Sequence, residues 1–216
     1  MKTRLIAGLL LGTTLLPMLQ GCVPVVAAGV TTGVLATFDR RSLGAQTEDE
    51  TIEWKASSRV SEKFGDKVHI NYTSYNRKVL LTGEVPSAEI KSEAEAIVSA
   101  VTNVQGVYNE LAIGVITAYS ARSNDAYITS KVKGRFVDAN RFNAIHVKVV
   151  TEAGNVYLMG LVTQREADAA VEVTRTTSGV KKVINVMEII SDAKARELDV
   201  PPPQKSKPAA PAESNS

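Results

Sequence analysis

The sequence predicts an α+β fold made of two tandem αββαβ units, each a three-stranded mixed sheet with two helices on one face. The first observation behind this prediction is an internal repeat, because residues 51–115 and 125–190 align at an offset of 76 to 77 positions. The second is the hydrophobic periodicity, which alternates in each copy between helix and strand spacing. Two copies are too few for a solenoid, so each copy is predicted to be a small domain.

The repeat is clearest in the second strand of each copy and at the end of each copy. Residues 79–85 (VLLTGEV) match residues 156–162 (VYLMGLV), and residues 104–109 (VQGVYN) match residues 180–185 (VKKVIN). The first pair differs by 77 positions and the second by 76, so one residue of gap aligns the copies. Because small domains have thin cores, the two units are expected to pack against each other.

Periodicity and turn residues give the order of elements. In the second copy, Ile128, Val132 and Phe136 recur every four residues, which is one stripe of a helix. Val147 and Val149 then alternate with a lysine, as on a half-buried strand. The elements expected in the second copy are this helix, a hairpin turning at 152–155, a helix over 163–177 ended by Gly179, and a strand over 180–190. Those expected in the first copy are a helix over 52–64, a hairpin turning at 74–76, a helix over 88–101 and a strand over 107–113.

Residues 1–21 have the pattern of an export signal. Two positive charges in residues 1–4 precede an uncharged, mostly apolar run, Leu5–Met18, and the small residue Gly21 stands directly before Cys22. The run is too short for a transmembrane helix, which needs about 20 apolar residues. Cys22 is the only cysteine, so no intrachain disulfide, thiol nucleophile or cysteine-containing metal site is expected.

Three further segments flank the repeated units. They are expected to be an N-terminal linker over 22–50, an inter-domain linker over 116–124 and a tail over 191–216. The tail is rich in Pro, Lys, Ser and Ala, a composition that predicts disorder because it offers little apolar surface to bury.

The end of the signal, Leu19-Gln20-Gly21-Cys22, resembles a bacterial lipobox. The resemblance implies that Cys22 is acylated and becomes the first residue of the mature chain. Three acyl chains would hold it permanently, because two already give stable anchoring. Val23 stands where an Asp would imply retention at the inner membrane, so the resemblance implies an outer-membrane lipoprotein that faces the periplasm.

The repeated unit resembles the BON domain. The resemblance rests on the αββαβ order, on a glycine and a valine at the end of the second strand (Gly83 with Val85), and on a final Val-x-x-Val-x-Asn pattern that ends at Asn109 and Asn185. Two such domains behind a lipobox are similar to the dual-BON outer-membrane lipoproteins. That family implies a non-enzymatic role in envelope integrity, with binding of anionic phospholipid such as phosphatidylglycerol through the second domain and accumulation at division sites.

The first helix of the second copy carries the candidate lipid contact. Between Asp125 and Asp138 it has three cations and no acidic residue. The second copy holds nine basic and seven acidic residues, against seven and eight in the first. An aromatic residue with cations on the following turns suits a headgroup interface, since a tyrosine ring is apolar while its hydroxyl stays hydrated. The predicted phospholipid-binding residues are Tyr127, Lys131, Lys133 and Arg135.

The resemblance also implies a lipid contact for Tyr127, because an aromatic residue, often Trp, occupies the matching position in the family. The residues alone leave a second interpretation open. In that interpretation Tyr127 packs on the sheet, and the three cations form an ordinary solvated face.

No pattern in the chain indicates catalysis. His69 and His146 occupy equivalent positions of the repeat, which favours a shared structural role over a catalytic or metal site. The sequence motifs of common hydrolases and phosphate-binding loops are absent, so we expect no enzyme activity, no cofactor and no small-molecule substrate. A net charge of +2 is too small to indicate a nucleic-acid partner.

One alternative function remains. The chain could be a periplasmic protein-interaction module that assists the outer-membrane assembly machinery without touching lipid, using a sheet edge or the apolar residues 23–38.

Overall fold

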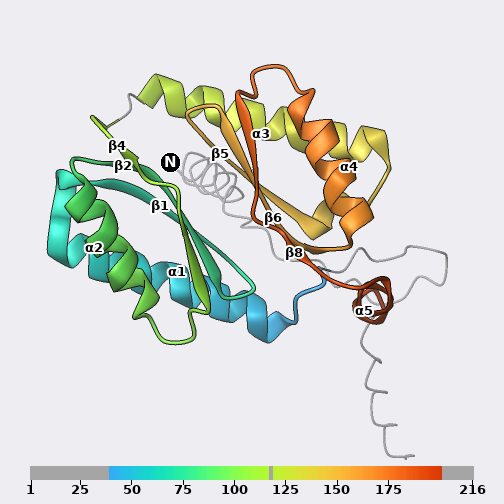
Figure 1. Ribbon diagram of the computed structural model, residues 1–216, viewed down its shortest axis with the longest axis horizontal. Coiled ribbons are helices and arrows are strands. Elements are labelled where there is room, and N and C mark those ends of the chain that lie inside the picture. Colours follow the sequence, from blue (N-terminus) through green and yellow to red (C-terminus); the bar gives the residue numbers. More distant parts are fainter. Residues whose placement is uncertain (1–38, 117–118, 201–216) are drawn as a thin grey trace, which may run out of the picture. The chain divides into compact units, whose positions relative to one another are not determined.

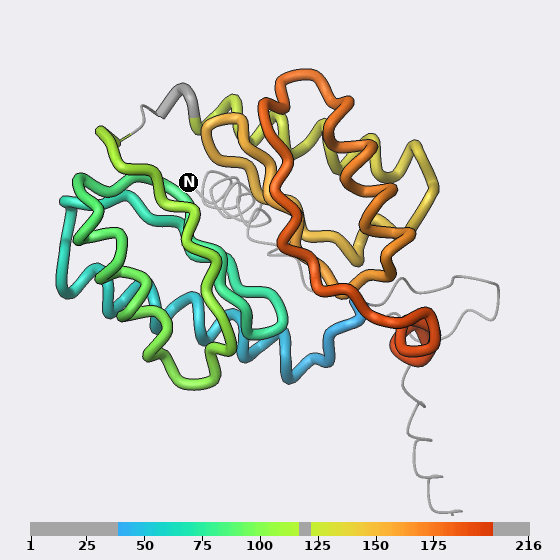
Figure 2. Tube along the Cα trace, viewed as in Figure 1, coloured from blue at the N-terminus to red at the C-terminus, as the bar shows by residue number. Residues whose placement is uncertain are grey.

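The computed structural model describes residues 39–116 and 119–200, and both repeats lie in one compact unit of the chain. Each repeat folds in the order helix, strand, strand, helix, strand, with both helices on one face of its sheet (Figure 1). The Cα trace of the second repeat follows the same path as that of the first (Figure 2). The predicted α+β class with two αββαβ units is therefore confirmed.

In the first repeat, β1 and β2 pair antiparallel, whereas β3 and β4 both pair parallel to β2. The third strand expected over 107–113 is interrupted, because Leu111 between β3 and β4 turns into the core. The elements are α1 (Leu43–Phe64), the 3-10 helix η1 (Gly65–Lys67), β1 (His69–Tyr75), β2 (Lys78–Val85), α2 (Ala88–Ser99), β3 (Gly106–Asn109) and β4 (Ala112–Ile113).

The second repeat has the same topology, with Met187 as the buried residue that interrupts its third strand. Its elements are α3 (Tyr119–Ala139), the 3-10 helix η2 (Ala144–His146), β5 (Val147–Glu152), β6 (Asn155–Val162), α4 (Gln164–Arg175), β7 (Lys182–Asn185) and β8 (Glu188–Ile189). A further helix, α5 (Asp192–Leu198), follows.

The helix stripes predicted from the sequence face the sheets. Ile128, Val132 and Phe136 of α3 are almost completely buried, and so is the equivalent stripe of α1 that begins at Ile52. Burying one such side chain contributes about 1.5–3 kcal/mol, so these stripes fix which face of each helix meets its sheet. The opposite face of α3 is thereby left toward solvent.

The helix-free faces of the two sheets share a second apolar cluster. Leu80 of β2 and Tyr157, Met159 and Leu161 of β6 are buried there together with Tyr75. Because β2 and β6 are covered on both faces, their sequences are nearly continuous runs of apolar residues and do not alternate between apolar and polar residues. The two small domains pack against each other, as expected from their thin cores.

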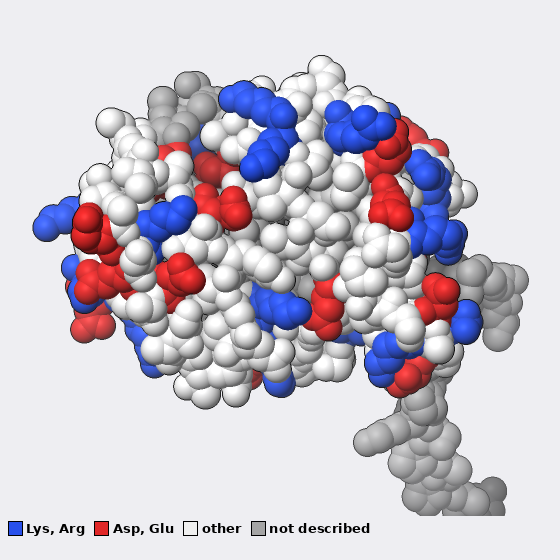
Figure 3. Space-filling view, viewed as in Figure 1, with Lys and Arg blue, Asp and Glu red and all other residues white. Residues whose placement is uncertain are grey.

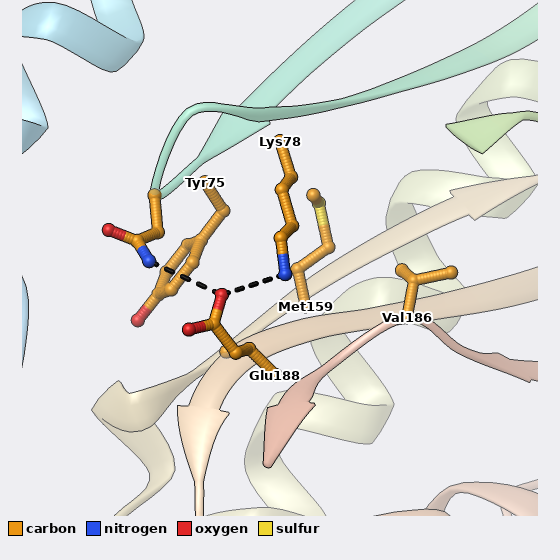
Figure 4. Close-up of a pocket in the computed structure, with 7 residues that line it drawn as sticks. Tyr75, Lys78, Met159, Val186 and Glu188 are labelled. Carbon is orange, nitrogen blue, oxygen red and sulfur yellow. Dashed lines mark hydrogen bonds and ion pairs between the residues drawn. The ribbon is translucent and has the colours of Figure 1, made fainter. Parts of the chain in front are cut away.

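A polar contact borders this cluster. Lys78 Nζ lies 2.9 Å from Glu188 Oε2, and Asn76 Nδ2 donates to the same oxygen at 3.3 Å (Figure 4). Lys78 and Asn76 belong to the β1–β2 hairpin, whereas Glu188 belongs to β8, so the contact joins the two repeats.

Two glycines allow the second strand of each repeat to approach closely the backbone at or just before the start of the first strand. A Cβ atom at Gly83 would lie 2.1 Å from the carbonyl oxygen of His69, and one at Gly160 would lie 2.3 Å from that of His146. Both positions therefore exclude every larger residue. The glycine at the strand end, which contributed to the family resemblance, is thus explained by backbone sterics.

Two hairpin turns are held by equivalent aspartates that the sequence interpretation overlooked. The Asp125 carboxylate accepts hydrogen bonds from the backbone N–H groups of Ala153 and Gly154, each at 2.8 Å. Asp49 accepts equivalent bonds from the N–H groups of the first hairpin turn. The central residues of both turns have positive φ, as type I′ hairpins require. The two aspartates are 76 residues apart, which is the offset of the repeat. Their equivalent positions in the sequence could therefore have predicted their shared role.

Three expected boundaries differ from the structure. α1 begins at Leu43, inside the expected linker 22–50, because Ser42 caps it by accepting a hydrogen bond from the Ala45 N–H at 3.1 Å. α3 likewise begins inside the expected linker 116–124. The expected disordered tail 191–216 begins with α5, which Ser191 caps. Residues 1–38, 117–118 and 201–216, and with them Cys22, lie outside the described residues.

The expected C-cap at Gly179 is wrong. α4 ends at Arg175, and Thr176 occupies the cap position. The hydroxyl of Thr177 donates to the Val173 carbonyl oxygen at 2.9 Å and helps to close the last turn. Gly179 lies in the turn beyond, where its φ of +95° suits glycine.

The segment before α1 is tied to both repeats by two arginines. Arg40 is 4% exposed, and its guanidinium donates to Glu166 at 2.7 and 3.0 Å and to Asp199 at 2.8 and 2.9 Å. Arg41 pairs with Asp49 of α1 at 2.8 Å and stacks 4.0 Å above the ring centre of Tyr75. Arg40 therefore joins this segment to α4 and to the end of α5, while Arg41 joins it to the first repeat.

Candidate functional site

The outward face of α3 carries exposed apolar side chains. Tyr127 is 63% exposed and Val137 is 67% exposed. At about 100° per residue these two lie on the side of the helix opposite Ile128, Val132 and Phe136. The interpretation in which Tyr127 packs on the sheet is therefore contradicted by its exposure.

Lys131 forms a pair with Tyr127. Its ammonium nitrogen lies 4.6 Å from the centre of the tyrosine ring and donates to the carbonyl oxygen of Ser178 at 2.5 Å. The cation–π contact holds the charge over the ring at the helix surface. The structure thus brings together two of the four predicted residues on one edge of the outward face.

Lys133 lies on the other edge of the same face. It is exposed and lines an open pocket of about 380 Å³ with Val137 and Ile145 of its own repeat. Lys148 also lines this pocket, and so does Arg41 of the segment before α1. We call Tyr127, Lys131, Lys133 and Val137 the α3 surface, an apolar centre flanked by one lysine on each side.

Arg135 has a different surrounding. Its Nη1 donates to the Val173 carbonyl oxygen at 3.1 Å and to the Thr177 hydroxyl at 2.9 Å. A cation at the end of α4 interacts favourably with the last carbonyl groups and with the helix dipole. The structure therefore separates Arg135 from the α3 surface and gives it a packing role between α3 and α4.

Charges of both signs cover the surface. On the face seen in Figure 3, basic and acidic side chains are interspersed over both repeats. The second copy contains more basic residues than the first, nine against seven. This small difference favours an anionic partner slightly more at the second repeat than at the first.

Val137 is the residue of this surface that sequence reasoning missed. The signal was available, since Tyr127, Gly134 and Val137 fall on one side of the helix at about 100° per residue. None of the helices in ranges 39–116 and 119–200 combines the length and the apolar character of a membrane span.

Comparison with known proteins shows which protein family the two repeats match. Residues 49–114 and 124–191 both match the BON domain. The chain is 39% identical over 184 residues to the outer membrane lipoprotein DolP of Haemophilus influenzae, covering 84% of this chain and 94% of that protein. It is 34% identical over 154 residues to the 21 kDa hemolysin of Actinobacillus pleuropneumoniae, covering 70% and 79%. The C-terminal domain of CdsD from Chlamydia trachomatis aligns with a TM-score of 0.28 at 14% identity, covering 64% of this chain and 96% of that one.

Proposed function

Since this chain belongs to the BON domain family, as a tandem pair of domains related to an outer membrane lipoprotein, we propose that its second domain binds anionic phospholipid. In this proposal acylated Cys22 anchors the chain to the outer membrane on its periplasmic side. The domains then support envelope integrity, including at sites of division. The relationship to DolP supports the outer-membrane location and the role in the envelope.

The observation that carries the proposal is the α3 surface. Tyr127 and Val137 are both more than half exposed, and Lys131 and Lys133 flank them. An aromatic ring and an aliphatic side chain are stabilised by entering the headgroup region of a bilayer. The aliphatic stems of the lysines can lie along the surface while their ammonium groups reach the lipid phosphates. The surface therefore has the chemistry of a helix that lies on an anionic bilayer.

The expected free energy of this contact is small without the anchor. Each lysine near an anionic surface contributes about 1 kcal/mol, so Lys131 and Lys133 together contribute about 2 kcal/mol. A chain already tethered to the same bilayer binds at a high effective concentration, which makes such a contact sufficient. The anchor and the α3 surface are thus complementary parts of one mechanism.

The proposal is tested by vesicle flotation of the full chain carrying Cys22→Ser, which removes the acylation site. We expect this chain to float with phosphatidylcholine vesicles that contain phosphatidylglycerol, and to float less with phosphatidylcholine alone or at high salt. Tyr127→Ala combined with Lys131→Glu should abolish flotation. The matched control is Trp54→Ala with Lys55→Glu on α1, where the aromatic is 70% exposed, and this variant should float normally.

The alternative is a protein-interaction module that assists the outer-membrane assembly machinery. It predicts that the Cys22→Ser chain does not float with either vesicle. It also predicts that Tyr127→Ala with Lys131→Glu weakens binding to a protein partner and has no effect on lipid binding. Equal flotation of the α3 variant and the unsubstituted chain would exclude the α3 surface as the lipid site.

A further inference from the structure

A histidine and two glutamates from different repeats converge where the sheets meet. His69 opens β1 and is paired in register with Glu84 of β2, and its Nδ1 lies 3.0 Å from Glu84 Oε2. Glu152, the last residue of β5 in the second repeat, completes the group. One ligand atom from each residue lies within 4.8 Å of the others. The sequence interpretation considered ligand spacing along the chain and so missed this set, which needs both a hairpin register and a domain contact.

Both carboxylates of this group are more than nine-tenths buried. Glu84 is 6% exposed and Glu152 is 8% exposed. Burying a carboxylate is costly unless a cation or several hydrogen bonds offset the loss of water. Glu152 accepts a hydrogen bond at 2.8 Å from the neutral amide of Asn71, and within the described part of the chain no Lys or Arg forms an ion pair with it. A buried carboxylate thus lies within 4.8 Å of a second carboxylate and an imidazole.

We propose that His69, Glu84 and Glu152 bind a divalent transition-metal ion of the zinc class. One imidazole nitrogen with two carboxylate oxygens is a donor set that zinc accepts, and the two carboxylates neutralise its charge. The imidazole disfavours Ca²⁺ and Mg²⁺, which prefer oxygen ligands alone. Three protein ligands leave a fourth position open to water.

The geometry needs only side-chain adjustment. Zinc lies about 2.0–2.2 Å from nitrogen and oxygen ligands, which places neighbouring ligand atoms about 3.3 Å apart in a tetrahedron. The 3.0 Å between His69 and Glu84 is already close to this value. Asn71 would remain the outer partner that orients Glu152, a role commonly found next to metal ligands.

An ion can reach this group from solvent. His69, Asn71 and Glu152 line an open pocket of about 300 Å³, whose wall also includes Asp125 and Arg122. Both oxygens of Asp125 accept backbone hydrogen bonds from the β5–β6 turn, so we do not count it among the ligands. Because the ligands come from both repeats, the bound ion would link the first domain to the second.

The test uses the full chain carrying Cys22→Ser, stripped of metal and titrated with Zn²⁺ in a calorimeter at neutral pH. The substitution removes the only thiol, so the two histidines and the carboxylates remain as strong ligands. We expect one Zn²⁺ per chain and a rise in the thermal unfolding midpoint. Because loss of an outer partner commonly lowers metal affinity about 10–100-fold, Asn71→Ala should weaken binding by that factor, and His69→Asn or Glu152→Gln by at least about 100-fold.

The controls are His146→Asn, which removes the other imidazole, and Glu188→Gln, which removes a carboxylate outside the group. Both should bind Zn²⁺ as the parent chain does, and circular dichroism checks that every variant is folded. Failure of the folded parent chain to bind Zn²⁺ would overturn the proposal. So would binding that His69→Asn and Glu152→Gln leave unchanged. Neither result depends on lipid binding, so this test is separate from that of the proposed function.

Discussion

Replacing Arg40 with alanine is expected to lower the free energy of unfolding by about 3–5 kcal/mol, the usual loss when one partner of a buried ion pair is removed. The substitution leaves the Glu166 carboxylate, whose side chain is 9% exposed, without its bidentate cation. It also removes the hydrogen bond of 2.9 Å to the Leu161 carbonyl oxygen. Urea unfolding followed by circular dichroism measures the loss.

The matched control is Arg196→Ala on α5, because Arg196 is exposed and substitutions at such positions usually change stability by less than about 0.5 kcal/mol. A loss below about 1 kcal/mol for Arg40→Ala would contradict the account of this contact.

The same contact makes stability depend on acid pH. Burial raises the pKa of Glu166, but hydrogen bonds and charge from Arg40 outweigh it and hold the pKa below its usual value. The Arg40 hydrogen bonds also lower the pKa of Asp199. A lowered pKa in the folded state stabilises the fold above the unfolded pKa of about 4, and this stability is lost as pH falls through the folded values. Arg40→Ala should therefore flatten the fall of stability with acid in that range.

Gly160→Ala is expected to destabilise the second repeat by about 3 kcal/mol or more, since overpacking against rigid neighbours is at the costly end of core substitutions. The new Cβ would lie 2.3 Å from the His146 carbonyl oxygen and 3.4 Å from Cγ1 of Val162. The nearer atom belongs to the backbone, so no side-chain rotation can relieve the clash. Thermal and urea unfolding of the variant measure the effect.

Gly134→Ala on α3 is the control, and it is expected to raise the free energy of unfolding. A Cβ there meets nothing within 4 Å, and alanine inside a helix is about 1 kcal/mol more favourable than glycine. An unchanged stability of Gly160→Ala would show that β6 does not approach the His146 carbonyl at the end of η2 as closely as described.

Much of the fold follows from short-range patterns. The stripes through Ile52 and Ile128 and the presence of both hairpins were predictable, because each depends on residues within one element or between two neighbours. The first turn was expected at 74–76 but lies at Asn76 and Arg77, since β1 continues through Tyr75. The helical start at Leu43 and the helix α5 were not predicted. α5 follows the second repeat directly, and Asp199 at its end is tied to Arg40, which lies 159 residues earlier in the chain. No local pattern reports such a contact.

In the candidate site, too, some features follow from local sequence patterns and others depend on tertiary contacts. Tyr127 and Lys131 were predicted from their spacing on one helix, and Lys133 from its place on the far side of the apolar stripe. The structure leaves Tyr127 and Lys133 exposed and Lys131 partly exposed on the outward side of α3. Arg135 has the same spacing, yet its side chain is held by the end of α4, since a neighbouring helix comes within its reach. Helical spacing predicts the side of a helix that a residue occupies, whereas the partner on that side depends on tertiary packing.

Tryptophan fluorescence of the Cys22→Ser chain tests the central claim, that the second repeat and not the first meets the bilayer. The chain contains one tryptophan, Trp54, which is 70% exposed on α1 and reports on the first repeat. The combined substitutions Trp54→Phe and Tyr127→Trp move the only indole to the α3 surface. We predict that phosphatidylglycerol vesicles shift the emission of the moved indole to shorter wavelength and that brominated lipid quenches it, while Trp54 in the parent chain shows neither effect. No shift and no quenching of the moved indole, or equal effects at both positions, would contradict the account.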